Sequence, residues 1–192
     1  MSEKGEITIW RAEGEDELWF ASKVYMDSFP PDERRSLNEW VDMSCHETRF
    51  SNNIIKCDGQ PVGIITIWHL RSFCYIEHFA LSENSRGQGI GGRALDELLS
   101  SQTEPVLLEV EIPEPPGSIA ERRALFYKRH GFRLWPGRYI QPPYSKEQQS
   151  LELRIMYHLP EGEAALSQDN YDAYIKEIYR AVYHVDSVAR SD

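Results

Sequence analysis

Short runs of alternating or continuous apolar residues recur along the chain, and Gly, Pro, Asp or Asn residues bound most of them. This pattern is typical of β-strands that are separated by tight turns. The predicted strands cover residues 7–12, 48–57, 61–70, 73–81, 105–112 and 151–159. Asp58-Gly59 separates the second and third strands and is a two-residue hairpin signal. We therefore expect these two strands to pair antiparallel.

Other segments repeat their apolar residues with the period of an α-helix. The predicted helices cover residues 15–29, 31–45, 93–101 and 118–132, and the tail adds a helix at 169–185. Pro30-Pro31 ends the first helix, because proline removes a backbone donor and disfavours a helical residue before it. Gly131 is expected to cap the C-terminal end of the fourth helix.

The order of these elements predicts an α/β protein. Consecutive strands with short links favour antiparallel pairing, whereas the β-α-β step within residues 73–112 favours a parallel one. We expect a mixed, mostly antiparallel central sheet with helices on both faces and an extra C-terminal helix. Residues 1–160 form the predicted domain, and residues 161–192 form a helical extension that packs on the domain or on a partner subunit. The tail's apolar stripe consists of Tyr171, Ile175, Ile178, Val182 and Val185.

Composition narrows the functional classes. The chain has 192 residues, a formal net charge of -10 and no cluster of Lys and Arg larger than a pair, so we expect no nucleic-acid partner. No apolar run approaches the ~18 residues of a membrane span, and the N-terminus lacks the pattern of a secretory signal. The three scattered cysteines, Cys45, Cys57 and Cys74, favour reduced thiols. Together these features predict a cytoplasmic protein without a membrane partner.

The segment from Gly87 to Gly92 matches the pattern Gly-x-Gly-x-x-Gly between a predicted strand and a predicted helix. Glycines let successive amides converge, and a helix N-terminus attracts anions, so a diphosphate is the expected ligand. A dinucleotide-binding turn is one interpretation, since Glu109 and Glu111 follow about 20 residues later. Against it, five polar residues separate the strand from the glycines, and the strand carries Glu77 and His78. No Gly-Lys-Ser/Thr follows, which excludes a Walker loop.

Two motifs resemble those of a known family. The spacing Arg86-x-x-Gly89-x-Gly91, which follows "YIEHFALS", resembles the acetyl-CoA motif of the GNAT N-acetyltransferase superfamily. The segment "LFYKRHGF", residues 125–132, resembles the late helix of that family, in which an aromatic pair precedes Gly-Phe. The order of elements agrees, and the likeness covers roughly residues 5–159. It implies an acetyl-CoA-dependent N-acetyltransferase without a metal cofactor.

The resemblance also implies how the cofactor is bound. In the family the sheet splays, here between strands 73–82 and 105–112, and the pantetheine arm lies along the first of these strands. The pyrophosphate is held by the glycine turn, with an arginine beside it. The implied cofactor-binding residues are Phe79, Ala80, Leu81, Arg86, Gly87, Gln88, Gly89, Ile90, Gly91 and Gly92.

Acyl transfer to an amine requires a base, because a protonated amine cannot attack a carbonyl. Glu77 lies on the strand that resembles the pantetheine-binding one, and Glu109 matches a strand position where some family members place their base. The resemblance makes Tyr127 the proton donor to the departing thiolate and the Leu81 N–H the oxyanion donor. A core tyrosine and solvated carboxylates remain the structural alternatives. His78 is expected on the opposite side from Glu77, because side chains alternate along a strand.

The acceptor is an amine of a small molecule, a peptide or a protein, and two segments are candidates for its cleft. Residues 28–36 supply Glu33 and Arg34, for which a solvated helix start is the alternative. The proline-containing segment 137–150 supplies Tyr139. Ala120 stands where many family members have an asparagine, seven residues before the late tyrosine. This departure motivates a second hypothesis, a non-catalytic acyl-CoA-binding module or sensor.

Overall fold

The computed structural model describes residues 5–163 and 165–186, which divide between two compact units. The first unit contains the residues up to His69 together with Ile76–Gln102. The second contains Leu70–Tyr75 together with the residues from Thr103 onward. Neither boundary coincides with the predicted division near residue 160, and that division into domains stays a prediction.

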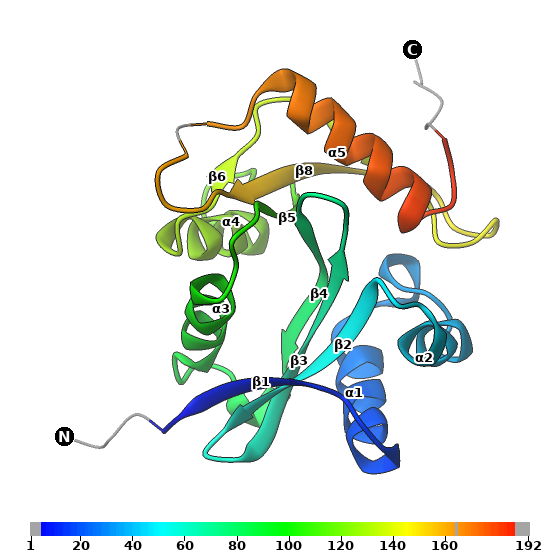
Figure 1. Ribbon diagram of the computed structural model, residues 1–192, viewed down its shortest axis with the longest axis vertical. Helices are drawn as coiled ribbons and strands as arrows, with labels where there is room; N and C mark the ends of the chain where they lie inside the picture. The colour runs from blue at the N-terminus through cyan, green and yellow to red at the C-terminus, as the bar shows by residue number, and fades with distance from the viewer. Residues whose placement is uncertain (1–4, 164, 187–192) are drawn as a thin grey trace. The chain divides into compact units, whose positions relative to one another are not determined.

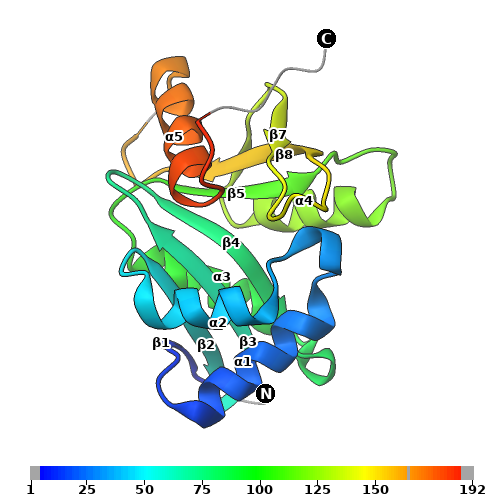
Figure 2. The same cartoon turned by 90° about the vertical axis from the view of Figure 1, so that its right-hand side faces the viewer.

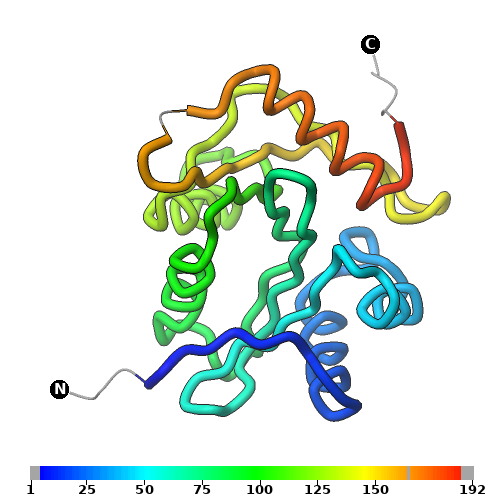
Figure 3. The backbone as a smooth tube through the Cα atoms, in the orientation of Figure 1, coloured from blue at the N-terminus to red at the C-terminus, as the bar shows by residue number. Residues whose placement is uncertain are grey.

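Four strands build the sheet of the first unit, except that the first two residues of β4 belong to the second unit. They follow one another in space in chain order: β1 (Ile7–Arg11), β2 (Phe50–Cys57), β3 (Gln60–His69) and β4 (Cys74–Leu81). β1 pairs with β2, and β2 with β3, in the antiparallel sense. The predicted hairpin is confirmed: φ is +51° at Asp58 and +75° at Gly59, and Figure 3 shows the backbone reversing there.

Helices cover both faces of this sheet (Figure 1). They are α1 (Glu15–Ser28), α2 (Leu37–His46) and α3 (Ile90–Ser100). Helices α1 and α2 lie on one face and α3 lies on the other. Tyr25 of α1 stacks on Trp40 of α2, with ring centroids 4.3 Å apart, and both side chains are fully buried.

The prediction that the second helix begins at residue 31 is wrong. Pro31–Glu33 form a 3₁₀ turn, η1, and α2 begins only at Leu37. Ser36 caps this helix, because its hydroxyl accepts from the Glu39 amide at 3.3 Å while the Glu39 carboxylate accepts from the Ser36 amide at 3.2 Å. This capping box satisfies two backbone donors at once, so it fixes the helix start at Leu37, six residues after Pro31. The residues between form a loop.

The second unit is built on β8 (Leu151–His158), which pairs antiparallel with each of the unit's other strands. These are β5 (Val106–Glu111), β6 (Arg133–Leu134) and β7 (Tyr139–Gln141). The sequence predicted β5 and β8 but not β6 and β7. Strands of two and three residues are too short to show a period of two, and the segment around β7 has the prolines and glycine of a loop.

Two helices lie on opposite faces of β5 and β8 (Figure 2). Helix α4 (Ile119–Arg129) ends as predicted, since Gly131 has a φ of +85° and its amide donates to the Lys128 carbonyl. Helix α5 (Gln168–Ala181) packs on the body of this unit. Its Tyr171 stacks on Trp135, and its Tyr174 stacks on Phe73, each with centroids 4.2 Å apart. A contact of the tail in a homodimer stays a prediction.

The predicted fold class is confirmed: the protein is α/β, its described strand pairs are antiparallel, helices cover both faces, and a C-terminal helix follows. The predicted splay between residues 73–82 and 105–112 stays a prediction. Within the described ranges, no helix has both the length and the apolar character that a membrane crossing requires.

Candidate active site

The glycine turn joins β4 to α3 through a short 3₁₀ turn, η2 (Glu83–Ser85). Gly87 and Gly89 adopt φ values of +76° and +72°, in the left-handed region that glycine tolerates best. A Cβ built on either residue would meet no atom within 4 Å, so the space beside the turn is open. Gly89 is the N-cap of α3, and the amides of the first helical turn have no acceptor within the helix. The turn therefore offers a site for an anion.

Arg86 fastens this turn to the end of β4. Its Nε donates to the carbonyl of Leu81 at 3.0 Å, and its Nη2 donates to the Ser28 hydroxyl at 3.2 Å. The side chain is exposed, so its charge is available at the entrance of the turn. On β3, a Cβ at Gly63 would lie 2.5 Å from the carbonyl oxygen of Ala80, which explains why glycine is needed beside this end of β4. The cofactor contacts of these residues stay predictions.

Glu77 lies in a buried ion pair within the first unit. Arg35 pairs with its carboxylate through Nη1, and the indole Nε1 of Trp68 donates to it at 2.8 Å. The Glu77 side chain is fully buried. Burial opposes ionisation, but the charge of Arg35 together with that of His78 and the hydrogen bonds from Arg35 and Trp68 outweighs it, so the pKa of Glu77 lies below its ordinary value. A carboxylate held in this way is a weak proton acceptor.

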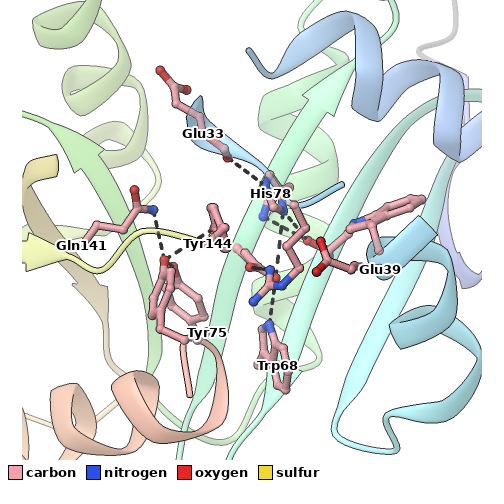
Figure 4. A network of polar contacts seen from close by, with 12 residues as sticks. Glu33, Glu39, Trp68, Tyr75, His78, Gln141 and Tyr144 are labelled. Carbon is pink, nitrogen blue, oxygen red and sulfur yellow. Dashed lines mark hydrogen bonds and ion pairs between the residues drawn. The ribbon is translucent and has the colours of Figure 1, made fainter. Parts of the chain in front are cut away.

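His78 is also buried, and like Glu77 it contacts the loop between α1 and α2 (Figure 4). Its Nδ1 lies 3.3 Å from the Thr66 hydroxyl, and its Nε2 lies 3.4 Å from the carbonyl oxygen of Glu33. Burial lowers the pKa of His78 to about 4, so the ring is neutral at pH 7. The expected separation of His78 from Glu77 is wrong, because Nδ1 lies 4.0 Å from the Glu77 carboxylate. Each of the two residues has one polar partner in the segment between α1 and α2 and another on β3.

That loop is tied inward at several points. Arg34 Nε donates to the carbonyl of Phe29 at 2.8 Å, and its guanidinium lies over the Tyr25 ring, 5.9 Å from the centroid. The amide of Arg35 donates to the Tyr25 hydroxyl at 3.0 Å. Arg34 therefore holds the loop in place, whereas the Glu33 side chain is exposed. Their predicted contacts with an acceptor stay predictions.

Glu109 forms the centre of a second polar cluster, within the second unit. Its carboxylate accepts from the Tyr139 hydroxyl and, at 2.6 Å, from Nε2 of Gln141. The Tyr183 hydroxyl, just beyond α5, lies 3.2 Å from each carboxylate oxygen. Tyr139 is buried, so it is a partner of Glu109 rather than part of an open loop. Every one of these three donors is neutral.

The phenols around Glu109 are strongly biased towards their protonated form. Burial raises the pKa values of Tyr75 and Tyr139 well above the ordinary value, and the negative charge of Glu109 raises them further. Figure 4 shows Tyr75, Gln141 and Tyr144 of this unit. The Tyr183 hydroxyl lies 3.3 Å from that of Tyr75 and 3.5 Å from that of Tyr144. The Tyr75 and Tyr139 hydroxyls can therefore donate hydrogen bonds at neutral pH without losing their protons.

Tyr127 lies on α4 among aromatic side chains. Its ring meets those of Phe126 and Phe132 edge to face, at centroid distances of 5.2 and 5.6 Å. Burial raises the pKa of Tyr127 to about 12, so its hydroxyl carries a proton at neutral pH. This packing suits a core tyrosine as well as a proton donor, and the catalytic role stays a prediction.

The sequence did not reveal which residues surround the two carboxylates. Arg35 and Trp68 lie 42 and 9 residues from Glu77, and Gln141 and Tyr183 lie 32 and 74 residues from Glu109. The tail pattern selected Val182 and Val185 for the apolar stripe and gave no signal for the tyrosine between them. Among the described residues, no group of three or more His, Cys, Asp or Glu side chains is placed to hold a metal ion.

Comparisons with known proteins agree with these features. The model of the acetyltransferase (GNAT) domain matches residues 51–134, from β2 to β6. The protein YjbC of Bacillus subtilis (strain 168), which is assigned as an acetyltransferase, is 36% identical over 82 residues. That match covers 43% of this chain and spans only 42% of the length of YjbC.

Solved structures extend the match over most of the chain. A Bacteroides thetaiotaomicron protein assigned to the GNAT family is 33% identical, covers 94% of this chain and 99% of its own, and has a TM-score of 0.84. The spermidine N-acetyltransferase of Vibrio cholerae, solved with CoA and spermine, is 15% identical. It covers 80% of this chain and 95% of its own with a TM-score of 0.56, which shows a shared fold. The glycine turn, the order of elements and the full-length match lead to one conclusion: this chain belongs to the GNAT family of acetyltransferases.

Proposed function

We propose that this protein transfers an acetyl group from acetyl-CoA to an amine by direct attack. The observation that carries the proposal is the glycine turn, in which two left-handed glycines with open space beside them lead into the N-terminus of α3. Such a turn suits the pyrophosphate of CoA. The Vibrio cholerae relative, whose structure contains CoA and spermine, supports both substrate classes.

The binding roles follow the family resemblance. The amides from Gly87 to Gly92 hold the pyrophosphate, and Arg86 adds a charge-assisted hydrogen bond. The backbone of Phe79, Ala80 and Leu81 binds the pantetheine arm. Gly63 supports this end of β4, because any larger residue would collide with the Ala80 carbonyl.

We assign the role of base to Glu109 rather than to Glu77. The guanidinium of Arg35 compensates the charge of Glu77 and lowers its pKa, which leaves little tendency to accept a proton. Glu109 is held by a phenol, an amide and a second phenol, which orient the carboxylate without adding a positive charge. It is also partly exposed, so a proton can reach it directly or through water.

The remaining roles are the proton transfers and the stabilisation of the developing negative charge. Glu109 takes a proton from the ammonium group, and the neutral amine then attacks the thioester carbonyl. The Leu81 N–H stabilises the negative charge that develops on the carbonyl oxygen. The new C–N bond leaves a positive charge on the nitrogen, and as the C–S bond breaks, Tyr127 gives its proton to the departing sulfur. The nitrogen then loses its second proton, which returns through water to the Tyr127 phenolate, and Glu109 releases the first proton to solvent. The Tyr127 pKa of about 12 keeps the hydroxyl protonated at neutral pH, so the proton is available when negative charge develops on the sulfur.

Binding and turnover of acetyl-CoA test the proposal directly. Calorimetric titration measures binding, and release of free thiol measures turnover with a panel of polyamines, amino acids and peptide N-termini. Gly89→Glu is expected to abolish binding, because bulk and negative charge meet the pyrophosphate. Gly14→Glu is the matched control, since Gly14 also caps a helix, has a φ of +84° and has open space around it.

Tyr127→Phe separates the enzyme from a non-catalytic acyl-CoA-binding module, the alternative that Ala120 motivates. An enzyme loses turnover with this change and keeps its affinity for acetyl-CoA. A module binds acetyl-CoA tightly and releases no thiol with any amine, with or without the change. Failure to bind acetyl-CoA at all contradicts both proposals.

A further inference from the structure

The hydroxyl of Tyr183 is the junction of the Glu109 cluster. Nε2 of Gln141 donates to it at 3.0 Å, and it donates in turn to the Glu109 carboxylate at 3.2 Å. Because the amide is a donor at this atom, the phenolic proton is directed at the carboxylate. Tyr183 is therefore a hydrogen-bond donor of fixed orientation to Glu109, and it comes from the C-terminal segment of the chain.

The position of this hydroxyl is set by the packing of α5. Stacking of Tyr171 on Trp135 and of Tyr174 on Phe73 holds the helix to the body of the second unit. The Tyr179 hydroxyl donates to the carbonyl of Ile140, in the same short strand that supplies Gln141. Tyr183 is 7% exposed. A hydroxyl placed by so many contacts can orient a neighbouring carboxylate with little loss of side-chain freedom.

We propose that Tyr183 is a positioning residue for the base Glu109, so that the C-terminal segment is part of the catalytic machinery. The inference rests on the proposed function, because it assigns Glu109 its task in acetyl transfer. A hydrogen bond to a carboxylate favours the ionised form, which is the form a base needs. Tyr183 thus orients the Glu109 carboxylate without adding a positive charge of the kind that opposes proton uptake at Glu77.

Other groups share the electrostatic environment of Glu109, and a pH profile reports on them together. Its described contacts come from β7 and from the segment after α5, and tyrosines on β4 and α5 feel its charge. Among the interactions described, the titratable groups that face Glu109 include Tyr75, Tyr139, Tyr171, Tyr179 and Tyr183. Burial raises the pKa values of Tyr75, Tyr139, Tyr171 and Tyr179, so these four phenols do not titrate on the acid limb of the profile.

The test compares Tyr183→Phe with Tyr179→Phe in the full chain. Each change removes one phenolic hydroxyl from the C-terminal segment, but only Tyr183 donates to Glu109, whereas Tyr179 donates to a backbone carbonyl. Tyr183→Phe is expected to lower kcat about tenfold and leave the KM for acetyl-CoA unchanged. It also moves the acid limb of kcat/KM to higher pH by on the order of one unit, because the ionised carboxylate loses a donor. Tyr179→Phe is expected to change both quantities less, because it leaves the hydroxyl that donates to Glu109 in place.

A second readout does not depend on activity. The titration midpoint of the Glu109 carboxyl carbon is followed by 13C NMR, with its resonance assigned by its loss in Glu109→Gln. The midpoint is expected to rise in Tyr183→Phe and to rise less in Tyr179→Phe, which keeps the hydroxyl that donates to Glu109. Unfolding by urea checks that both variants remain folded.

The outcomes separate the two proposals. If an active wild type is matched by Tyr183→Phe in kcat, pH profile and NMR midpoint, the inference is overturned and the proposed function stands. The inference is also overturned if Tyr179→Phe produces the same changes as Tyr183→Phe, since the effect is then structural. A wild type that binds acetyl-CoA and acetylates no amine overturns the proposed function, and with it the catalytic part of the inference, whatever the midpoint does.

Discussion

The two carboxylates Glu77 and Glu109, one in each unit, differ in what surrounds them. Glu77 meets a guanidinium and an indole N–H and is wholly buried. Glu109 meets two phenols and an amide and is partly exposed. Both residues lie on strands and both are acidic, so the residue type says nothing about which of them can accept a proton.

The difference shows that the role of a carboxylate depends on whether its hydrogen-bond partners are charged or neutral. An ion pair offsets the desolvation of both charges only while both partners are present, so the loss of either partner destabilises the fold. Neutral donors orient a carboxylate and leave its charge to act on a substrate. We therefore expect changes at Glu77 to appear mainly in stability and changes at Glu109 mainly in turnover.

The largest effect is expected from Glu77→Gln, which leaves Arg35 buried without its counter-charge. The free energy of unfolding should fall by about 3–5 kcal/mol, as measured by urea denaturation. The double variant Arg35→Met with Glu77→Leu should recover most of this loss, because it removes both charges together. A stable Glu77→Gln protein without activity contradicts the comparison, since Glu77 then acts in the chemistry.

Acid should destabilise the first unit through His78. Its pKa is about 4 in the folded state against about 6.5 for an unperturbed histidine, so the unfolded chain binds the proton more tightly. Stability is constant above pH 6.5 and falls as the pH drops towards 4, by about 3 kcal/mol across this window. The lowered pKa of Glu77 acts in the same direction at still lower pH.

Urea denaturation at several pH values measures this slope, and His78→Gln provides the reference. Glutamine keeps a polar side chain at position 78 but, unlike histidine, does not titrate between pH 4 and 7. Its stability should therefore fall less steeply in acid than that of the wild type. Equal slopes in the two proteins would show that His78 does not resist protonation.

Glu109→Gln should lower kcat by on the order of 100-fold, because the amide cannot accept the proton of the amine. The loss of stability should be smaller than that caused by Glu77→Gln, since no buried cation is left behind among the contacts described. Thiol release at saturating acetyl-CoA measures the first quantity and urea denaturation the second. Unchanged kcat in a folded variant would move the role of base to another group.

The smallest effect is expected from Ser36→Ala, which removes the capping box directly after Arg35. Loss of an N-cap should lower the free energy of unfolding by about 1 kcal/mol. Acetyl-CoA affinity should not change. A loss as large as that of Glu77→Gln would mean that the cap of α2, rather than the ion pair, holds the loop before it.

The local signals in the sequence were strong where one short segment decides the structure. The Asp58-Gly59 turn, the Gly131 cap and the glycine turn before α3 each depend on backbone conformations that few residues adopt, so their residues predict them. The start of α2 was missed because the acidic residues after Pro31 resemble a first helical turn, whereas the Ser36–Glu39 box fixes the true start. β6 and β7 were missed because they are too short to carry a pattern.

The sequence by itself determined the fold class, the position of the glycine turn and the pair of motifs that resemble the family. Only the tertiary structure decided that Glu77 is paired with Arg35 and that Glu109 is held by Gln141 and Tyr183. The reason is physical: periodicity and turn chemistry act between neighbours along the chain. The ionisation of a buried carboxylate, by contrast, depends on the charges and donors that folding brings to it from far away in the sequence.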